Sequence, residues 1–183
     1  MIRVVLVVLV SVALLATALP ALNDARTTTT VDRLETEGER LDRAIGSLDA
    51  ESVAIDDPSL AARTTVTLRA PTGITAARID RLALGDPERI IDTDRTVHDR
   101  STIGRTTTAE TGQSGDRSLP NVAIVYVLSG GSPRVIPVTS AGSTTSIRVV
   151  DGPIELRTGG SSRLELRLVD THGTGTVRVA RVR

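Results

Sequence analysis

The side chains that could bind a metal ion are few and far apart in the sequence. His98 lies beside Asp99 in a polar stretch, and His172 lies in a Gly-rich turn near the C-terminus. Asp92 and Asp94 resemble a fragment of a calcium-binding loop, but the Gly and the distal Glu of such a loop are missing. The chain has no Cys, which excludes zinc-thiolate sites and disulfides. We therefore expect no metal site and no cofactor.

Motifs for nucleophilic or phosphate chemistry are also missing from the sequence. There is no G-x-S-x-G elbow, and an S-x-x-K element is impossible because the chain has no Lys. Gly130-Gly131 precede Ser-Pro and not the Lys-Ser/Thr of a phosphate loop, so they predict a hairpin turn. Carboxylates that converge only in three dimensions would escape this search. We expect a non-enzymatic protein without catalytic residues, and an unrecognised hydrolase is kept as the third alternative.

Composition limits both the partners and the core. The 22 basic residues are balanced by 22 acidic ones, and only 1% of the residues are aromatic. Nucleic-acid binding usually needs a basic excess and often uses aromatic rings for base stacking, so we expect no nucleic-acid partner. The chain of 183 residues is long enough for one domain and an anchor, with a core of Val, Leu and Ile. Branched aliphatic residues of this kind favour strands.

An apolar segment from Ile2 to Leu22 dominates the N-terminus. As a helix rising about 1.5 Å per residue it is about 31 Å long, which is enough to cross a hydrocarbon core of about 30 Å. The sum of the insertion free energies of its Val and Leu residues is roughly a few kcal/mol in favour of the membrane. The residues predicted to anchor the chain are Val4, Leu6, Leu9, Val12, Leu15 and Leu19.

Three interpretations of residues 1–22 are open. The segment could be a secretory signal, for which Ala16-Thr17-Ala18 offers a small-residue cleavage site. It could be a buried core helix, or it could be an uncleaved transmembrane anchor. We favour the anchor, which makes the membrane itself the first partner. Arg3, the only charge before the apolar run, then places the N-terminus inside and the C-terminal domain outside a cell membrane that the chain crosses once.

Residues 23–57 form the predicted amphipathic stalk helix. Pro20 is expected to kink or restart the helix, and Asn23 or Asp24 could cap the second segment. Gly38 occupies one position of the apolar stripe, which follows a heptad and whose other members are Val31, Leu34, Leu41, Ile45 and Leu48. The stripe could pack on the chain's own domain or could contact a partner helix.

Residues 58–183 are predicted to form a mainly antiparallel β domain. Short strands of alternating or continuous apolar residues, separated by Gly-containing turns, favour a sandwich or a bent sheet. The clearest hairpin joins residues 163–169 to residues 176–182, and residues 122–128 are typical of a central strand. The polar stretch at about 92–119 is expected to be a flexible loop. The predicted fold class is therefore α+β.

The order of these elements resembles that of type IV pilin-like proteins, in which an N-terminal apolar helix continues into an amphipathic helix and a β domain. The opening MIRVVL, the all-Arg composition and the VRVARVR end also look like a group of uncharacterised haloarchaeal membrane-anchored proteins associated with loci for pilus-like secretion machinery. This resemblance implies a non-enzymatic accessory or structural component of a cell-envelope assembly, with other envelope, pilus or secretion proteins as partners. A signal-cleaved exported binding domain is the alternative.

Overall fold

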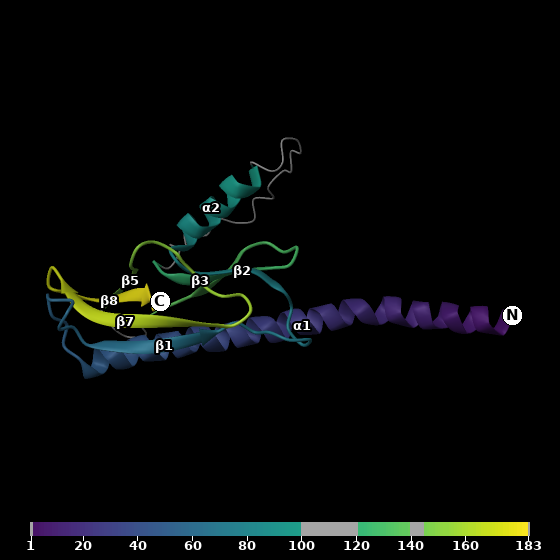
Figure 1. Cartoon of the computed structure of the whole chain (residues 1–183), viewed down its shortest axis with the longest axis horizontal. Helices are drawn as coiled ribbons and strands as arrows, with labels where there is room; N and C mark the ends of the chain where they lie inside the picture. Colours follow the sequence, from purple (N-terminus) through teal and green to yellow (C-terminus); the bar gives the residue numbers. More distant parts are fainter. Residues whose placement is uncertain (1, 100–120, 140–144, 183) are drawn as a thin grey trace.

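A computed structural model describes residues 2–99, 121–139 and 145–182 of the chain (Figure 1). It confirms the predicted α+β class, with a long N-terminal helix followed by a mainly antiparallel β domain. The elements in chain order are α1 (Ile2–Glu51), β1 (Arg63–Arg69), β2 (Ile79–Gly85), α2 (Pro87–Asp99), β3 (Ala123–Leu128), β4 (Arg134–Pro137), β5 (Ser146–Val149), β6 (Ile154–Glu155), β7 (Ser161–Thr171) and β8 (Thr174–Arg181).

Helix α1 is one continuous element of 50 residues, about 75 Å long at about 1.5 Å per residue. Residues 2–22 of the predicted anchor and residues 23–51 of the predicted stalk are therefore parts of the same helix. The prediction that the stalk helix continues to residue 57 is wrong for residues 52–57, because the chain leaves the helix after Glu51 and Ile55 pairs with Val169 of β7. The prediction that Pro20 restarts the helix is wrong, because Pro20 lies inside it and Asn23 and Asp24 do not act as caps. Pro20 lacks the backbone N–H that would bond to the carbonyl of Ala16, so one helical hydrogen bond is lost, but the helix continues on both sides of it.

The C-terminal half of α1 and two four-stranded sheets enclose one hydrophobic core. The sheets have the strand orders β1-β7-β8-β5 and β4-β3-β2-β6. The core combines side chains from all three parts, including Leu41 and Ile45 of α1, Leu166 of β7 and Leu84 of β2. Helix α1 runs alongside the sheets and contacts β1 most extensively (Figure 1). The stripe on α1 is therefore a structural part of the β domain.

Gly38 lets α1 approach the second sheet closely. A Cβ atom built on Gly38 would lie 3.1 Å from Cγ2 of Ile136 in β4, which is tighter than ordinary van der Waals contact. Strand β4 thus packs against the helix at Gly38, the one position of the heptad stripe that has no side chain. A larger residue at position 38 would push the helix and this sheet apart.

The strands follow the predicted apolar patterns closely. Strand β3 is an interior strand as predicted, since it pairs with both β2 and β4. The predicted C-terminal hairpin is formed by β7 and β8, with Leu166 opposite Val179. Its turn is shorter than expected and contains only His172 and Gly173, which both have positive φ, as a two-residue type I′ turn requires. Strand β5 departs from the antiparallel pattern and pairs parallel to β8.

The first turns of helix α2 pack on the outer face of the second sheet, from which the helix projects (Figure 1). Ala83 of β2 and Val125 of β3 alternate with core-facing neighbours and pack with Ile90 of α2 in a second, smaller apolar cluster. The prediction of a loop from about residue 92 to 119 is wrong for residues 92–99, which continue α2. Residues 100–119 lie outside the described residues.

Three carboxylates tie α1 to the ends of strands. Glu37 accepts a hydrogen bond from the backbone N–H of Arg69 at 3.1 Å, and Asp42 accepts one from the backbone N–H of Thr139 at 3.0 Å. Asp49 accepts a hydrogen bond from the Thr145 hydroxyl. Burial raises the pKa of Asp42, while the Thr139 bond works in the opposite direction. These bonds fix the position of the helix along its axis, which apolar packing alone leaves free to slide.

The two halves of α1 should respond differently to the same substitution. Leu41 is fully buried, so Leu41→Ala should lower the free energy of unfolding by about 2–5 kcal/mol, because it removes apolar contacts and leaves a cavity. Leu15→Ala in the exposed N-terminal half of the same helix should change it by less than about 0.5 kcal/mol. Denaturant unfolding of both variants in a mild detergent measures the difference. Equal effects would contradict the division of the helix.

Candidate functional site

The N-terminal half of α1 projects from the β domain as a bare apolar rod (Figure 1). Its most apolar window has a mean hydropathy of 2.7, and none of that window is buried. The predicted anchor residues with described side chains are all at least half exposed, namely Leu6, Leu9, Val12, Leu15 and Leu19, and Val4 lies in the same helix. The helix is long and apolar enough to cross a membrane. The interpretation of this segment as a buried core helix is therefore wrong.

The polar groups of this rod are satisfied within the helix. The hydroxyl of Ser11 donates to the carbonyl of Val7 at 2.8 Å, and the hydroxyl of Thr17 donates to the carbonyl of Leu14 at 2.9 Å. A hydroxyl that is already bonded to its own helix costs little to transfer into an apolar medium. Ser11 and Thr17 are the only polar residues between Val4 and Leu19, so this part of the helix is compatible with lipid on every side.

The apolar stripe of the second half is occupied by the chain's own sheets. Four of its members have between 0% and 7% of their surface exposed, and Val31 packs partly buried against them; the four are Leu34, Leu41, Ile45 and Leu48. Of the two alternatives that the sequence left open, the structure shows packing on the chain's own domain. The assignment of this stripe to a partner helix is corrected, because its side chains are already covered.

The junction between the rod and the domain lies at Arg26–Thr30. Thr30 is fully buried, and its hydroxyl accepts a hydrogen bond from the backbone N–H of Ala77 at 2.8 Å while donating to the carbonyl of Arg26 at 2.8 Å. Ala77 belongs to the connection between β1 and β2, so this bond attaches the first loop of the domain to the helix. Thr30 stands in a run of four Thr residues, and nothing in the sequence distinguishes it from exposed Thr28.

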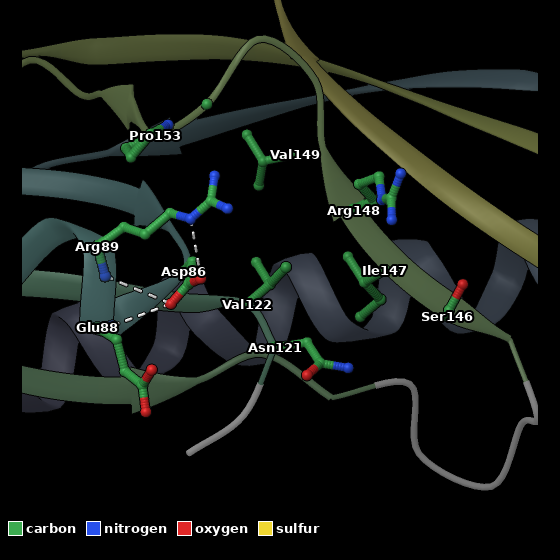
Figure 2. Close-up of a pocket in the computed structure, with 11 residues that line it drawn as sticks. Asp86, Glu88, Arg89, Asn121, Val122, Ser146, Ile147, Arg148, Val149 and Pro153 are labelled. Carbon is green, nitrogen blue, oxygen red and sulfur yellow. Dashed lines mark hydrogen bonds and ion pairs between the residues drawn. The ribbon is translucent and has the colours of Figure 1, made fainter. Parts of the chain in front are cut away.

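An open hollow of about 790 Å³ lies where α2 begins, beside β5 and the start of β3 (Figure 2). Two of its charged side chains have structural partners: the carboxylate of Asp86 accepts the N–H of Glu88 at 3.0 Å at the start of α2 and forms an ion pair with Arg89 at 3.5 Å. The hydroxyl of Ser146 is hydrogen bonded to that of Thr176 at 2.9 Å. The hollow therefore presents a capped helix end and a strand edge, without a nucleophile paired to a base among the side chains shown in Figure 2.

The residues with metal-binding chemistry are dispersed. His172 lies in the β7–β8 turn, and the segment that contains Asp92, Asp94, His98 and Asp99 forms the C-terminal part of α2. Within residues 2–99, 121–139 and 145–182, no three His, Asp or Glu side chains that can be placed lie close enough to hold a metal ion.

The bond at the junction can be tested with a near-isosteric substitution. Thr30→Val should destabilise the domain by about 1–3 kcal/mol, because it leaves the partly buried N–H of Ala77 without its acceptor, the fully buried Thr30 hydroxyl. Thr28→Val is the matched control, since the Thr28 hydroxyl is exposed and bonds only to the carbonyl of Asp24; it should change stability by less than about 0.5 kcal/mol. Urea unfolding measures both variants, and a neutral Thr30→Val would show that the junction does not depend on this bond.

Comparison with known proteins gives one match. A family model described as a domain of unknown function, DUF7311, matches residues 1–182, so it includes the apolar rod as well as the β domain. No curated protein and no solved structure matches the chain. Because the model matches nearly the whole sequence, the chain belongs to the DUF7311 family.

Proposed function

We propose that this protein is a single-pass membrane protein whose N-terminal helix anchors a non-enzymatic β domain outside the cell, as an accessory or structural component of a cell-envelope assembly. The observation that carries the proposal is the exposure of the apolar half of α1. Burying such a surface in lipid is worth about 25 cal/mol per Å². Left in water, an apolar patch of this size would drive association or aggregation.

The continuity of α1 supports retention of the anchor after insertion. The Ala16-Thr17-Ala18 site lies in the interior of the helix, where the backbone is hydrogen bonded and not extended. Proteolysis concentrates at exposed loops and not within helices. The alternative, a signal-cleaved exported binding domain, would require this part of the helix to unwind for the protease.

The orientation rests on Arg3, which lies at the N-terminal end of the apolar segment. The positive-inside tendency favours keeping this residue on the cytoplasmic side, which places the β domain outside. The assembly itself is proposed to be pilus-like or secretion-associated. Its support is the order of the elements, an apolar helix that continues without a break into the core of a β domain.

The non-enzymatic part of the proposal rests on how the described polar side chains are used. Asp86 caps α2, Asp42 and Glu37 hold α1 against the strands, and Ser146 is bonded to Thr176. These groups stabilise the fold. Partners in an envelope assembly would then contact the exposed faces of the domain.

Arginine substitutions in the rod test the anchor. Leu9→Arg combined with Val12→Arg should move the protein from the membrane to the soluble fraction or abolish its accumulation, because each Arg costs about 2.5–3.5 kcal/mol at the centre of a membrane helix. The pair therefore exceeds the insertion energy of a few kcal/mol. Thr28→Arg, on the exposed face of the same helix beyond the apolar segment, is the control and should leave the protein in the membrane. Carbonate-washed membranes provide the measurement.

The mass of the mature protein separates the anchor from the signal peptide. We expect the N-terminal segment to be retained in full, so the intact mass should include all of residues 1–22. Removal of the chain up to Ala18 would instead establish the exported alternative. Loss of only the first few residues would indicate a pilin-type leader.

A further inference from the structure

The side of the β domain that faces the apolar rod includes two connections, residues 71–78 between β1 and β2 and residues 129–133 between β3 and β4 (Figure 1). They are fastened to each other by a hydrogen bond from the N–H of Ser129 to the carbonyl of Arg78 at 2.9 Å. The first is also fastened to α1 through Ala77 and Thr30. Together they make a surface whose position relative to the rod is fixed.

The most exposed large apolar side chain of this surface is Ile74, of which 86% is accessible. It follows Gly73, whose φ of 99° turns the chain outward in a conformation that L side chains rarely adopt. A single exposed apolar residue needs no explanation on most surfaces. Here its place matters, because it stands on the side of the domain from which the apolar rod emerges.

The charges on this surface are positive. Neither connection contains an acidic residue, and Arg78 and Arg134 stand at their ends. Arg78 is 83% exposed, and its partner Asp80 at 3.3 Å is partly exposed, so this ion pair leaves the guanidinium accessible. On α1, Asp24 and Asp32 lie on either side of Thr30, which bonds to this surface. The opposite end of the domain carries Asp56, Asp57 and Asp170 together with Arg63 and Arg167, so it has no comparable basic excess.

The surface is within reach of a membrane that holds the rod. Thr30, which binds Ala77, lies about 12 Å along the helix from Leu22, the last residue of the apolar segment. The headgroup region adds about 5–7 Å on each side of the hydrocarbon core, and transmembrane helices tilt by about 20° on average. Residues 73–76 form a turn closed by a hydrogen bond from the N–H of Ala76 to the carbonyl of Gly73 at 3.2 Å, and the β1–β2 connection lies beside α1 on the side from which the rod emerges (Figure 1). Ile74 therefore projects from a turn that is held beside the helix, and tilting of the helix brings this turn toward the headgroups.

We propose that residues 71–78 form a second membrane contact, in which Ile74 enters the headgroup region and Arg78 lies against anionic lipid phosphates. This inference rests on the proposed membrane anchor. A rod alone leaves the domain free to rotate about the helix axis and to tilt. A second contact on one side of the rod removes that freedom, so the domain presents a constant face to its partners. Arg at such a surface gains about 1 kcal/mol from anionic lipid, or about a fivefold shift toward contact.

The chain has no Cys, so single-cysteine variants can report the depth of chosen positions. The full-length protein would be reconstituted in phosphatidylcholine vesicles with and without phosphatidylglycerol. A fluorophore would be attached at Ile74→Cys, at Leu9→Cys in the rod, and at Leu60→Cys. Leu60 is the matched control, because it is 74% exposed and lies in the connection between α1 and β1, at the end of the domain away from the rod. Quenchers in the lipid and in the water would be compared for each label.

We expect the label at position 74 to be quenched by headgroup-level lipid quenchers and the label at position 60 only by the aqueous quencher. Arg78→Gln should reduce the lipid contact of position 74 about fivefold in vesicles with phosphatidylglycerol, whereas Arg63→Gln at the far end of β1 should not change it. Contact should also weaken when phosphatidylglycerol is omitted.

If the label at position 74 is as accessible to water as the label at position 60, while the label at position 9 is buried in lipid, this inference is overturned and the anchor stands. Position 9 accessible to water would overturn the anchor itself. Equal lipid contact of position 74 in both vesicle types, or no effect of Arg78→Gln, would overturn the role assigned to anionic lipid.

Discussion

The packing of one apolar stripe on α1 against two β-sheets is the interaction on which the rest of the structure depends. Leu34, Leu41, Ile45 and Leu48 lie in the same core cluster as the inward-facing residues of both sheets. Each sheet has only four strands, and the core contains a single Tyr and no Phe or Trp. Small aliphatic side chains fill such a space only if a third element closes it. The helix is that element, so the β domain and the stripe form a single cooperative unit.

The exposed rod follows from the same helix. Because α1 continues through Pro20 to the apolar N-terminus, the core that holds its C-terminal half also fixes the direction in which its N-terminal half leaves the domain. The bond between Thr30 and Ala77 and the carboxylates of Glu37 and Asp42 set the axial position of the helix. A membrane that accepts the rod would therefore hold the domain at a fixed distance from the bilayer, and only tilt and rotation about the helix axis would be left to a second contact. A flexible stalk would give the domain no such fixed distance.

Much of this fold could be predicted from local patterns. Alternation of Leu164, Leu166 and Leu168 with polar residues located β7, and a continuous apolar run located β3. A membrane segment was predictable because the run is apolar on every face of a helix, whereas a helix that packs on a soluble domain is apolar on one stripe. Each of these features depends on residues close together in the sequence. The short type I′ turn at His172-Gly173 is also local, but its length depends on the φ of His172, which a non-Gly residue seldom adopts.

The features that escaped prediction depend on distant contacts. A heptad stripe is compatible with a partner helix or with the chain's own sheets, and only the tertiary structure shows which surface covers it. The extension of α2 past residue 92 depends on Ile90 finding a site on Ala83 and Val125. The importance of Thr30 depends on Ala77, which is far away in the sequence. The side of the domain on which Ile74 lies also depends on the tertiary structure and not on the residues next to it in the sequence.

The central claim is that one uninterrupted helix is both the membrane anchor and a core element, and a distance across Pro20 tests it most directly. Nitroxide labels at Leu14→Cys and Thr36→Cys, in a chain without other Cys, would lie on nearly the same face of α1 and about 33 Å apart at about 1.5 Å per residue. Pulsed electron paramagnetic resonance on the reconstituted protein should give a narrow distribution near this value. A broad distribution, or a clearly shorter mean distance, would show a hinge at Pro20 and would contradict the account.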